Sequence, residues 1–172
     1  MTKHKGLLAM LGGLLRPSKR TTRIVGEEDQ PGRTGVSATI ELAPPASGAL
    51  RLHYAPAPDG DPDGGEVVWT WVPYAERDGR GKDRPVLVIG RQDAERVYAI
   101  KLTSQSRDGD RDFLHVGSGA WDSKGRPSWA DIDQLYSVHV DGMRREASAL
   151  DPERFARVAD ALQRRYGWKV AS

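Results

Sequence analysis

From residue 66 onward, apolar residues gather in short runs rich in β-branched and aromatic side chains, a pattern typical of β-strands. These runs cover residues 66–72, 85–89, 97–102, 113–116 and 132–140. The continuously apolar run 85–89 predicts a strand buried on both faces. The run 132–140 predicts a strand in which Leu135, Ser137 and His139 alternate with Tyr136, Val138 and Val140. A long, polar, glycine-rich loop is expected over residues 75–83.

A single helix is predicted after the strands. Asp151 is a favourable N-cap, Pro152 suits the first helical position, and Gly167 supplies a stop. Between them, one apolar stripe recurs at helical spacing: Phe155, Val158, Ala159, Leu162 and Tyr166. We therefore expect a mainly β (α+β) fold, in which an SH3-like small barrel is closed by a C-terminal α-helix.

The N-terminal third predicts a poorly ordered extension. Residues 26–48 are rich in Gly, Pro, Glu and Asp and offer little apolar surface to offset the entropy of ordering. Residues 49–54 alternate apolar and polar side chains, as an edge strand does, before Pro56 and Pro58. We expect a basic tail (1–25), an acidic Gly/Pro-rich linker (26–63) and a barrel domain (64–172).

The basic tail contains an apolar stretch, Leu7 to Leu15, between clusters of Lys and Arg. The favoured interpretation is a frayed helical tail. A short amphipathic helix, with residues 3–23 on an anionic membrane surface, is an alternative. A signal peptide competes with both, but no small-residue cleavage pattern follows the apolar stretch closely.

Charge is strongly segregated along the chain, although the net charge is only +2. Residues 1–25 carry +6, residues 26–63 carry −5, and the remainder carries +1. The predicted domain therefore has a mixed surface, which excludes a highly basic nucleic-acid coat. The absence of cysteine excludes disulfides and Cys nucleophiles and fits a reducing, cytoplasmic location. No apolar run approaches the roughly 18–20 residues that span a bilayer.

Familiar catalytic motifs are missing: there is no Gly-rich phosphate loop, no HExxH and no paired His at metal spacing. We therefore expect no metal and no cofactor. Two polar junctions remain, at residues 81–85 and 102–106. Pro85 forces Arg84 into an extended conformation, and Thr103, Ser104 and Gln105 follow a strand. Arg and hydroxyl groups together suit a phosphate, but an ordinary strand-end turn explains the same residues.

The order of these elements resembles the PemK/MazF-like family of type II toxin endoribonucleases. The resemblance rests on residues 65–69, 84–89, 102–105, 126–129 and 133–135, followed by the helix at 154–168, and covers about residues 64–168. It implies an SH3-like barrel, usually a homodimer, that cuts single-stranded RNA without a metal. It also implies a cognate antitoxin protein as partner.

The resemblance also implies the catalytic pair. Arg84, before the Pro of the second strand, would stabilise charge on the phosphoryl oxygens, and Thr103 would orient the phosphate. Some members place a Glu a few residues before this Arg, but residues 78–83 contain none in register. The group that accepts the 2′-hydroxyl proton is therefore left unassigned.

Six further residues are predicted to bind RNA: Arg77, Arg80, Lys82, Ser104, Gln105 and Gln134. The first three make the loop basic, which suits an RNA backbone and equally suits a solvated loop. Gln134 fits either a place along the groove or a structural hydrogen bond. Trp69 and Trp71 share a strand face and suit packing, base stacking or a dimer seal. The alternative function is a non-catalytic SH3-like barrel that binds nucleic acid or a protein partner.

Overall fold

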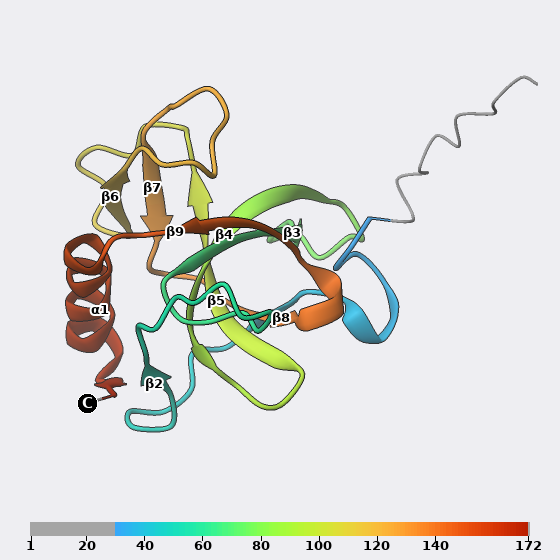
Figure 1. Cartoon of the computed structure of the whole chain (residues 1–172), viewed down its shortest axis with the longest axis horizontal. Helices are drawn as coiled ribbons and strands as arrows, with labels where there is room; N and C mark the ends of the chain where they lie inside the picture. Colours follow the sequence, from blue (N-terminus) through green and yellow to red (C-terminus); the bar gives the residue numbers. More distant parts are fainter. Residues whose placement is uncertain (1–29, 172) are drawn as a thin grey trace, which may run out of the picture.

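The computed structural model describes residues 30–171, which form a strongly bent sheet with one helix at its side (Figure 1). In chain order the elements are η2 (Gly35–Ser37), β1 (Ile40–Leu42), β2 (Arg51–Leu52), β3 (Glu66–Pro73), β4 (Gly81–Arg91), β5 (Arg96–Thr103), β6 (Phe113–Gly117), β7 (Ser128–Asp131), β8 (Leu135–His139), η3 (Val140–Gly142), β9 (Arg144–Ala149), α1 (Pro152–Tyr166) and β10 (Lys169–Val170).

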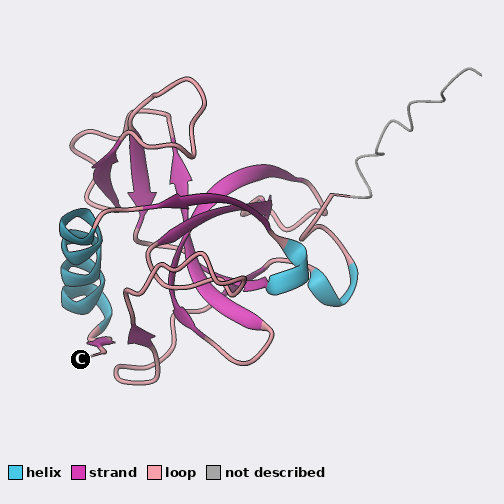
Figure 2. Cartoon of the chain, in the orientation of Figure 1, coloured by secondary structure: helices cyan, strands magenta, loops and turns pink. Residues whose placement is uncertain are grey.

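Antiparallel pairing joins eight of these strands, and Figure 2 shows how far strands dominate the fold. The main path runs β1-β8-β5-β4-β3-β9, and β7 joins β5 to β6 beside it. The path begins and ends on different strands, so the sheet is not a closed barrel. The fold is α+β, as expected, and its main sheet is antiparallel, but the predicted SH3-like closure is not confirmed.

Two apolar clusters cover opposite faces of the central strands. On β4, Leu87 and Ile89 belong to the cluster beneath α1, whereas Val86 and Val88 belong to the other. Each of these four side chains is fully buried. The prediction that residues 85–89 form a strand buried on both faces is therefore correct.

Helix α1 has the predicted ends. The Asp151 carboxylate accepts a hydrogen bond from the Arg154 backbone N–H at 3.0 Å. Gly167 ends the helix in the left-handed conformation with φ 69°. The buried side chains of the predicted stripe pack into the larger cluster: Phe155, Val158, Ala159 and Leu162.

Residues 30–63, part of the segment expected to be an acidic linker, contribute strand pairing and core side chains to the fold. Strand β1 pairs with β8, and both Leu50 and Leu52 are completely buried in the larger cluster. The low apolar content did not indicate this order, because a few apolar side chains are enough to fix a segment on a sheet that other residues form. The strand predicted at 49–54 is present only as β2, which pairs in parallel with β10.

Two predictions in the sheet need correction, and one strand was not predicted. The loop at 75–83 is shorter than expected because β4 already begins at Gly81. The strand expected over 132–140 begins only at Leu135, a separate strand β7 precedes it, and all of β8 is buried. Strand β9 was not predicted, because its sequence RREASA lacks an apolar pattern and its order depends on pairing with β3.

The helical stretch at 7–15 and the membrane contact proposed for residues 3–23 lie outside the described residues. Within residues 30–171, no helix is long and apolar enough to cross a membrane.

Candidate active site

The candidate site lies where the sheet divides. Strands β4 and β5 pair as far as Val86 and Lys101. Beyond that point β5 pairs with β7 through Leu102 and Thr103, while Arg84 of β4 pairs with Thr70 of β3. The two strand ends therefore separate, and a pocket of about 420 Å³ lies between them. Its walls are Lys82, Asp83, Arg84 and Pro85 on one side and Leu102, Thr103, Ser104 and Gln105 on the other.

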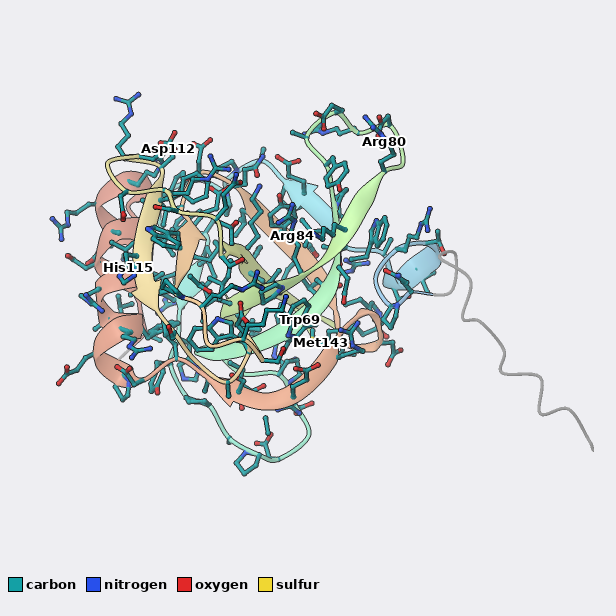
Figure 3. All side chains as sticks on the ribbon, turned by 90° about the horizontal axis from the view of Figure 1, so that it is seen from above. Trp69, Arg80, Arg84, Asp112, His115 and Met143 are labelled. Carbon is teal, nitrogen blue, oxygen red and sulfur yellow. The ribbon has the colours of Figure 1, made fainter. Side chains whose placement is uncertain are left out.

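Arg84 is the distinctive cation of this pocket. Its side chain is half-buried, and it forms no hydrogen bond or ion pair with any other residue in the described range 30–171. Figure 3 shows it within the body of the sheet, whereas Arg80 lies out in the β3–β4 loop. Removing a guanidinium from water without a partner is costly, so this arrangement is suited to an anionic ligand.

Arg84 also lines a second pocket, of about 360 Å³, together with Glu76, Arg80 and Lys101. Arg84 is therefore part of the lining of both pockets. A chain that carries successive phosphates, such as a nucleic acid strand, can occupy both while one phosphate contacts Arg84.

Thr103 lies across the pocket with its hydroxyl hydrogen available. Its Oγ1 accepts a hydrogen bond from the Gln105 backbone N–H at 3.2 Å. This bond uses an acceptor lone pair and leaves the O–H donor for a ligand. Ser104 and Gln105 are exposed on the same turn, and Gln105 Oε1 accepts from Arg107 Nη2 at 3.2 Å. The structure thus brings Arg84, Lys82, Thr103, Ser104 and Gln105 to one pocket.

The loop after β6 closes the pocket with ordered polar contacts. The Trp121 indole is almost fully buried and donates to Ser128 Oγ at 3.1 Å. Asp122 accepts from the Lys124 backbone at 2.8 Å and from Arg126 Nε at 2.9 Å. Burial alone raises the pKa of Asp122, but these hydrogen bonds outweigh it and hold the pKa below its ordinary value. Asp122 is therefore an ionised structural acceptor.

The predicted loop cations differ in position. Lys82 lines the first pocket and Arg80 the second, but Arg80 is paired with Asp78 at 2.7 Å. Arg77 is exposed in the loop and lines neither pocket. The three residues are therefore not equivalent candidates for contact with a ligand.

Gln134 also lies outside both pockets. Its Oε1 accepts hydrogen bonds from Lys101 Nζ and from Tyr136 OH, the latter at 3.1 Å. Its Nε2 donates to Glu41 Oε1 at 3.4 Å. Of the two interpretations of Gln134, this geometry favours the structural hydrogen bond.

Sequence reasoning missed several residues that surround the pockets. Glu76 and Lys101 share the second pocket with Arg84, and Asp122 and Arg126 line the first. Glu76 precedes Arg84 by eight residues, outside the window in which a carboxylate was sought. Lys101 is a charged residue inside an otherwise apolar strand, and this isolated charge could have marked it as a candidate site residue.

Another pocket of about 420 Å³ lies between residues 56–60 and β9. Its cation, Arg145, binds both carboxylate oxygens of Glu66, at 2.7 and 2.8 Å from Nη2. It is therefore less suited to an anion than the pocket at Arg84. Across residues 30–171, no three His, Cys, Asp or Glu side chains cluster as a metal site.

Comparison with known proteins supports the chain's family assignment. Residues 63–165 match the family described as the PemK-like, MazF-like toxin of type II toxin-antitoxin system. No curated protein matches the chain.

Three solved structures similar to the chain are distant from it in sequence. An endoribonuclease in complex with its cognate antitoxin, from mycobacterial species, is 18% identical over 62% of this chain and 96% of its own, with a TM-score of 0.48. MazE-MazF from Deinococcus radiodurans is 22% identical over 62% and 96%, with a TM-score of 0.46. Toxin MazF-mt6 from Mycobacterium tuberculosis is 18% identical over 60% and 98%, with a TM-score of 0.46.

Proposed function

Because the chain belongs to the PemK-like, MazF-like toxins of type II toxin–antitoxin systems, we propose that it is an endoribonuclease that cleaves single-stranded RNA between Arg84 and Thr103. The observation that carries this proposal is the half-buried Arg84, whose side chain has no hydrogen bond or ion pair within residues 30–171 and which lines the same pocket as Thr103. A phosphodiester supplies the anion that both groups require.

The chemistry follows from these two groups. The 2′-oxygen of the RNA attacks the adjacent phosphorus, a new P–O2′ bond forms, and the P–O5′ bond breaks. Negative charge gathers on the phosphoryl oxygens in the transition state, where Arg84 and the Thr103 O–H donate hydrogen bonds. The products are a 2′,3′-cyclic phosphate and a 5′-hydroxyl. Arg84 acts electrostatically rather than as a base, because a guanidinium keeps its proton.

We assign the proton acceptor to Glu76. Glu76 lines the second pocket together with Arg84, whereas Asp83 is paired with Arg144 at 2.8 Å and Asp122 is held by two hydrogen bonds. The 2′-hydroxyl proton passes to Glu76, the departing 5′-oxygen takes a proton from water, and Glu76 then returns its proton to the solvent. No step requires a metal ion, since Arg84 supplies the positive charge that one would provide.

RNA binding extends beyond the scissile phosphate. Lys82 lines the first pocket, and Arg80 lines the second with Glu76. Trp69 lines the first pocket and another of about 350 Å³, and Arg144 lies over its ring at 5.9 Å from the centroid. This half-buried indole is proposed to stack on a base. Ser104 and Gln105 offer hydrogen bonds to the same strand of RNA.

The partners follow from family membership. A cognate antitoxin protein is proposed to bind the toxin, as in the complexes of the structural neighbours. A homodimer and a cytoplasmic location complete the proposal.

The test compares RNA cleavage by the wild type, Arg84→Ala and Arg91→Ala, in EDTA. Arg91 is an exposed arginine at the far end of the same strand and serves as the matched control. Removal of Arg84 is expected to reduce cleavage on the order of a hundredfold or more, whereas Arg91→Ala leaves it unchanged. A wild type that binds RNA without cutting it supports the non-catalytic alternative and ends the enzymatic proposal.

A further inference from the structure

A strand from outside the family-matched region reaches the side of the candidate site. The match begins at residue 63, but β1 lies at Ile40–Leu42 and pairs with β8, with Glu41 opposite Tyr136. Directly opposed residues of antiparallel strands share a face, so Glu41 lies on the face that carries Tyr136. The carboxylate of Glu41 therefore comes from the segment that precedes the family-matched region.

This strand is held firmly in register. The Arg96 guanidinium donates to the carbonyl oxygens of Val36 and Ala38, at 2.6 and 3.2 Å. The hydroxyls of Thr39 and Thr70 are hydrogen-bonded at 2.7 Å inside the fold. Contacts from β5 and β3 therefore fix the backbone on which Glu41 stands.

Glu41 completes a chain of hydrogen bonds that ends on Lys101. Gln134 accepts from Lys101 and Tyr136 through Oε1, so its Nε2 must point the other way, where Glu41 Oε1 receives it at 3.4 Å. A reversed amide would direct its NH₂ group at the ammonium of Lys101. It would also direct its carbonyl oxygen at the carboxylate of Glu41, so Glu41 favours the amide orientation in which Oε1 accepts from Lys101.

Lys101 in turn stands beside Arg84. Its Nζ lies 3.2 Å from Asp131 Oδ2, and Asp131 is 4% exposed. An ammonium has three N–H donors; Asp131 and Gln134 take two, and Lys101 lines the pocket that also contains Arg84. The third donor is available to a phosphate oxygen in that pocket.

Several charged side chains surround the buried phenol of Tyr136. Burial, together with the charges of Glu41 and Asp131, raises the pKa of Tyr136, and Arg84 opposes the rise. Glu41, Asp131 and Arg84 are thus close enough to act on one buried phenol. Tyr136 remains a hydrogen-bond donor to Gln134 throughout the neutral pH range.

We propose that Glu41 is a positioning residue of the ribonuclease site, which acts through Gln134 to hold Lys101 against a substrate phosphate beside Arg84. The N-terminal segment that carries Glu41 therefore contributes to catalysis as well as to the fold. The inference rests on the proposed ribonuclease function, and it assigns Glu41 no contact with RNA.

The test is a double-mutant cycle between Glu41 and Gln134, with kcat and KM measured on one RNA. Glu41→Leu is expected to lower kcat/KM about 10- to 100-fold, as small misplacements of substrate-binding groups do. Glu41→Gln, whose amide oxygen still accepts from Gln134, should stay within about threefold of wild type, because the acceptor is retained. In the Gln134→Leu background, Glu41→Leu should cost almost nothing. Glu95→Leu, at an exposed carboxylate, is the matched control.

Two outcomes overturn the inference: Glu41→Leu leaves kcat/KM unchanged, or it costs as much without Gln134 as with it. If Glu41→Leu fails to fold, Gln134→Leu, which leaves β1 intact, must itself lower kcat/KM at least tenfold by the same positioning argument. Arg84→Ala on the same RNA separates the two proposals. If Arg84→Ala loses cleavage while Glu41→Leu keeps it in full, only the proposed role of Glu41 is rejected. If the wild type does not cleave RNA, the proposed ribonuclease function is rejected.

Discussion

Leu52 provides a strong test of whether the N-terminal segment belongs to the folded domain. Its side chain is completely buried in the larger apolar cluster, although it precedes the family-matched region. Leu52→Ala removes buried methyl and methylene groups and leaves a cavity, at a cost of about 2–5 kcal/mol. For a chain of this size, that cost corresponds to a melting temperature lower by about 4–20 °C.

The measurement is unfolding by heat and by urea, followed by far-ultraviolet circular dichroism. Val36→Ala is the control, because Val36 belongs to the same segment but is 87% exposed, and it should change the stability by less than about 0.5 kcal/mol. If Leu52→Ala shifts the midpoint no more than Val36→Ala, the segment is a solvated linker. The structural argument for a role of Glu41 then fails with it.

Three further predictions concern the site and its surroundings. Thr103→Val should lower kcat on the order of a hundredfold while Thr103→Ser keeps most activity, because only serine retains the O–H donor; single-turnover cleavage measures both. Trp69→Leu should weaken binding to single-stranded RNA by about 1–3 kcal/mol and Trp69→Phe by less, because base stacking needs an aromatic ring; fluorescence anisotropy titration would show equal affinities if Trp69 only packs. The folded pKa of Tyr136 lies above the unfolded value of 10.0, so its contribution to stability is complete below that pH and declines above it, as the unfolded phenol ionises first. Between about pH 9 and 11, the free energy of unfolding should therefore fall less for Tyr136→Phe than for the wild type. Equal falls in urea titrations of the two proteins would contradict a raised pKa for Tyr136.

The local sequence pattern was sufficient to predict those elements whose periodicity and end residues specify them. The apolar run at 85–89 and the capped stripe of α1 were predictable, because side-chain periodicity and end residues specify them. Strand β9 was not, since its polar sequence becomes a strand only by pairing with β3. Strand β1 shows the same limit, because its order comes from β8, more than ninety residues later.

The candidate site shows the same division. Arg84 and Thr103 stood out in the sequence because each follows or precedes a strand at a polar junction, and the family resemblance assigned their roles. Glu76 and Lys101 were not selected, because the β3–β4 loop and the pairing of β4 with β5 bring them to the pocket of Arg84 only in the folded chain. Gln134 was selected for RNA contact, but its position in the fold gives it hydrogen bonds to Lys101 and Tyr136 instead.

The central claim is that the 2′-hydroxyl of RNA is the nucleophile at the pocket between Arg84 and Thr103. The most direct measurement uses two otherwise identical oligonucleotides, one all-RNA and one with a single 2′-deoxynucleotide on the 5′ side of the cleaved bond, both in EDTA. The account predicts that the all-RNA strand yields a 2′,3′-cyclic phosphate and a 5′-hydroxyl, and that the deoxy-substituted bond stays intact. Cleavage of the deoxy-substituted bond at the same rate would contradict it.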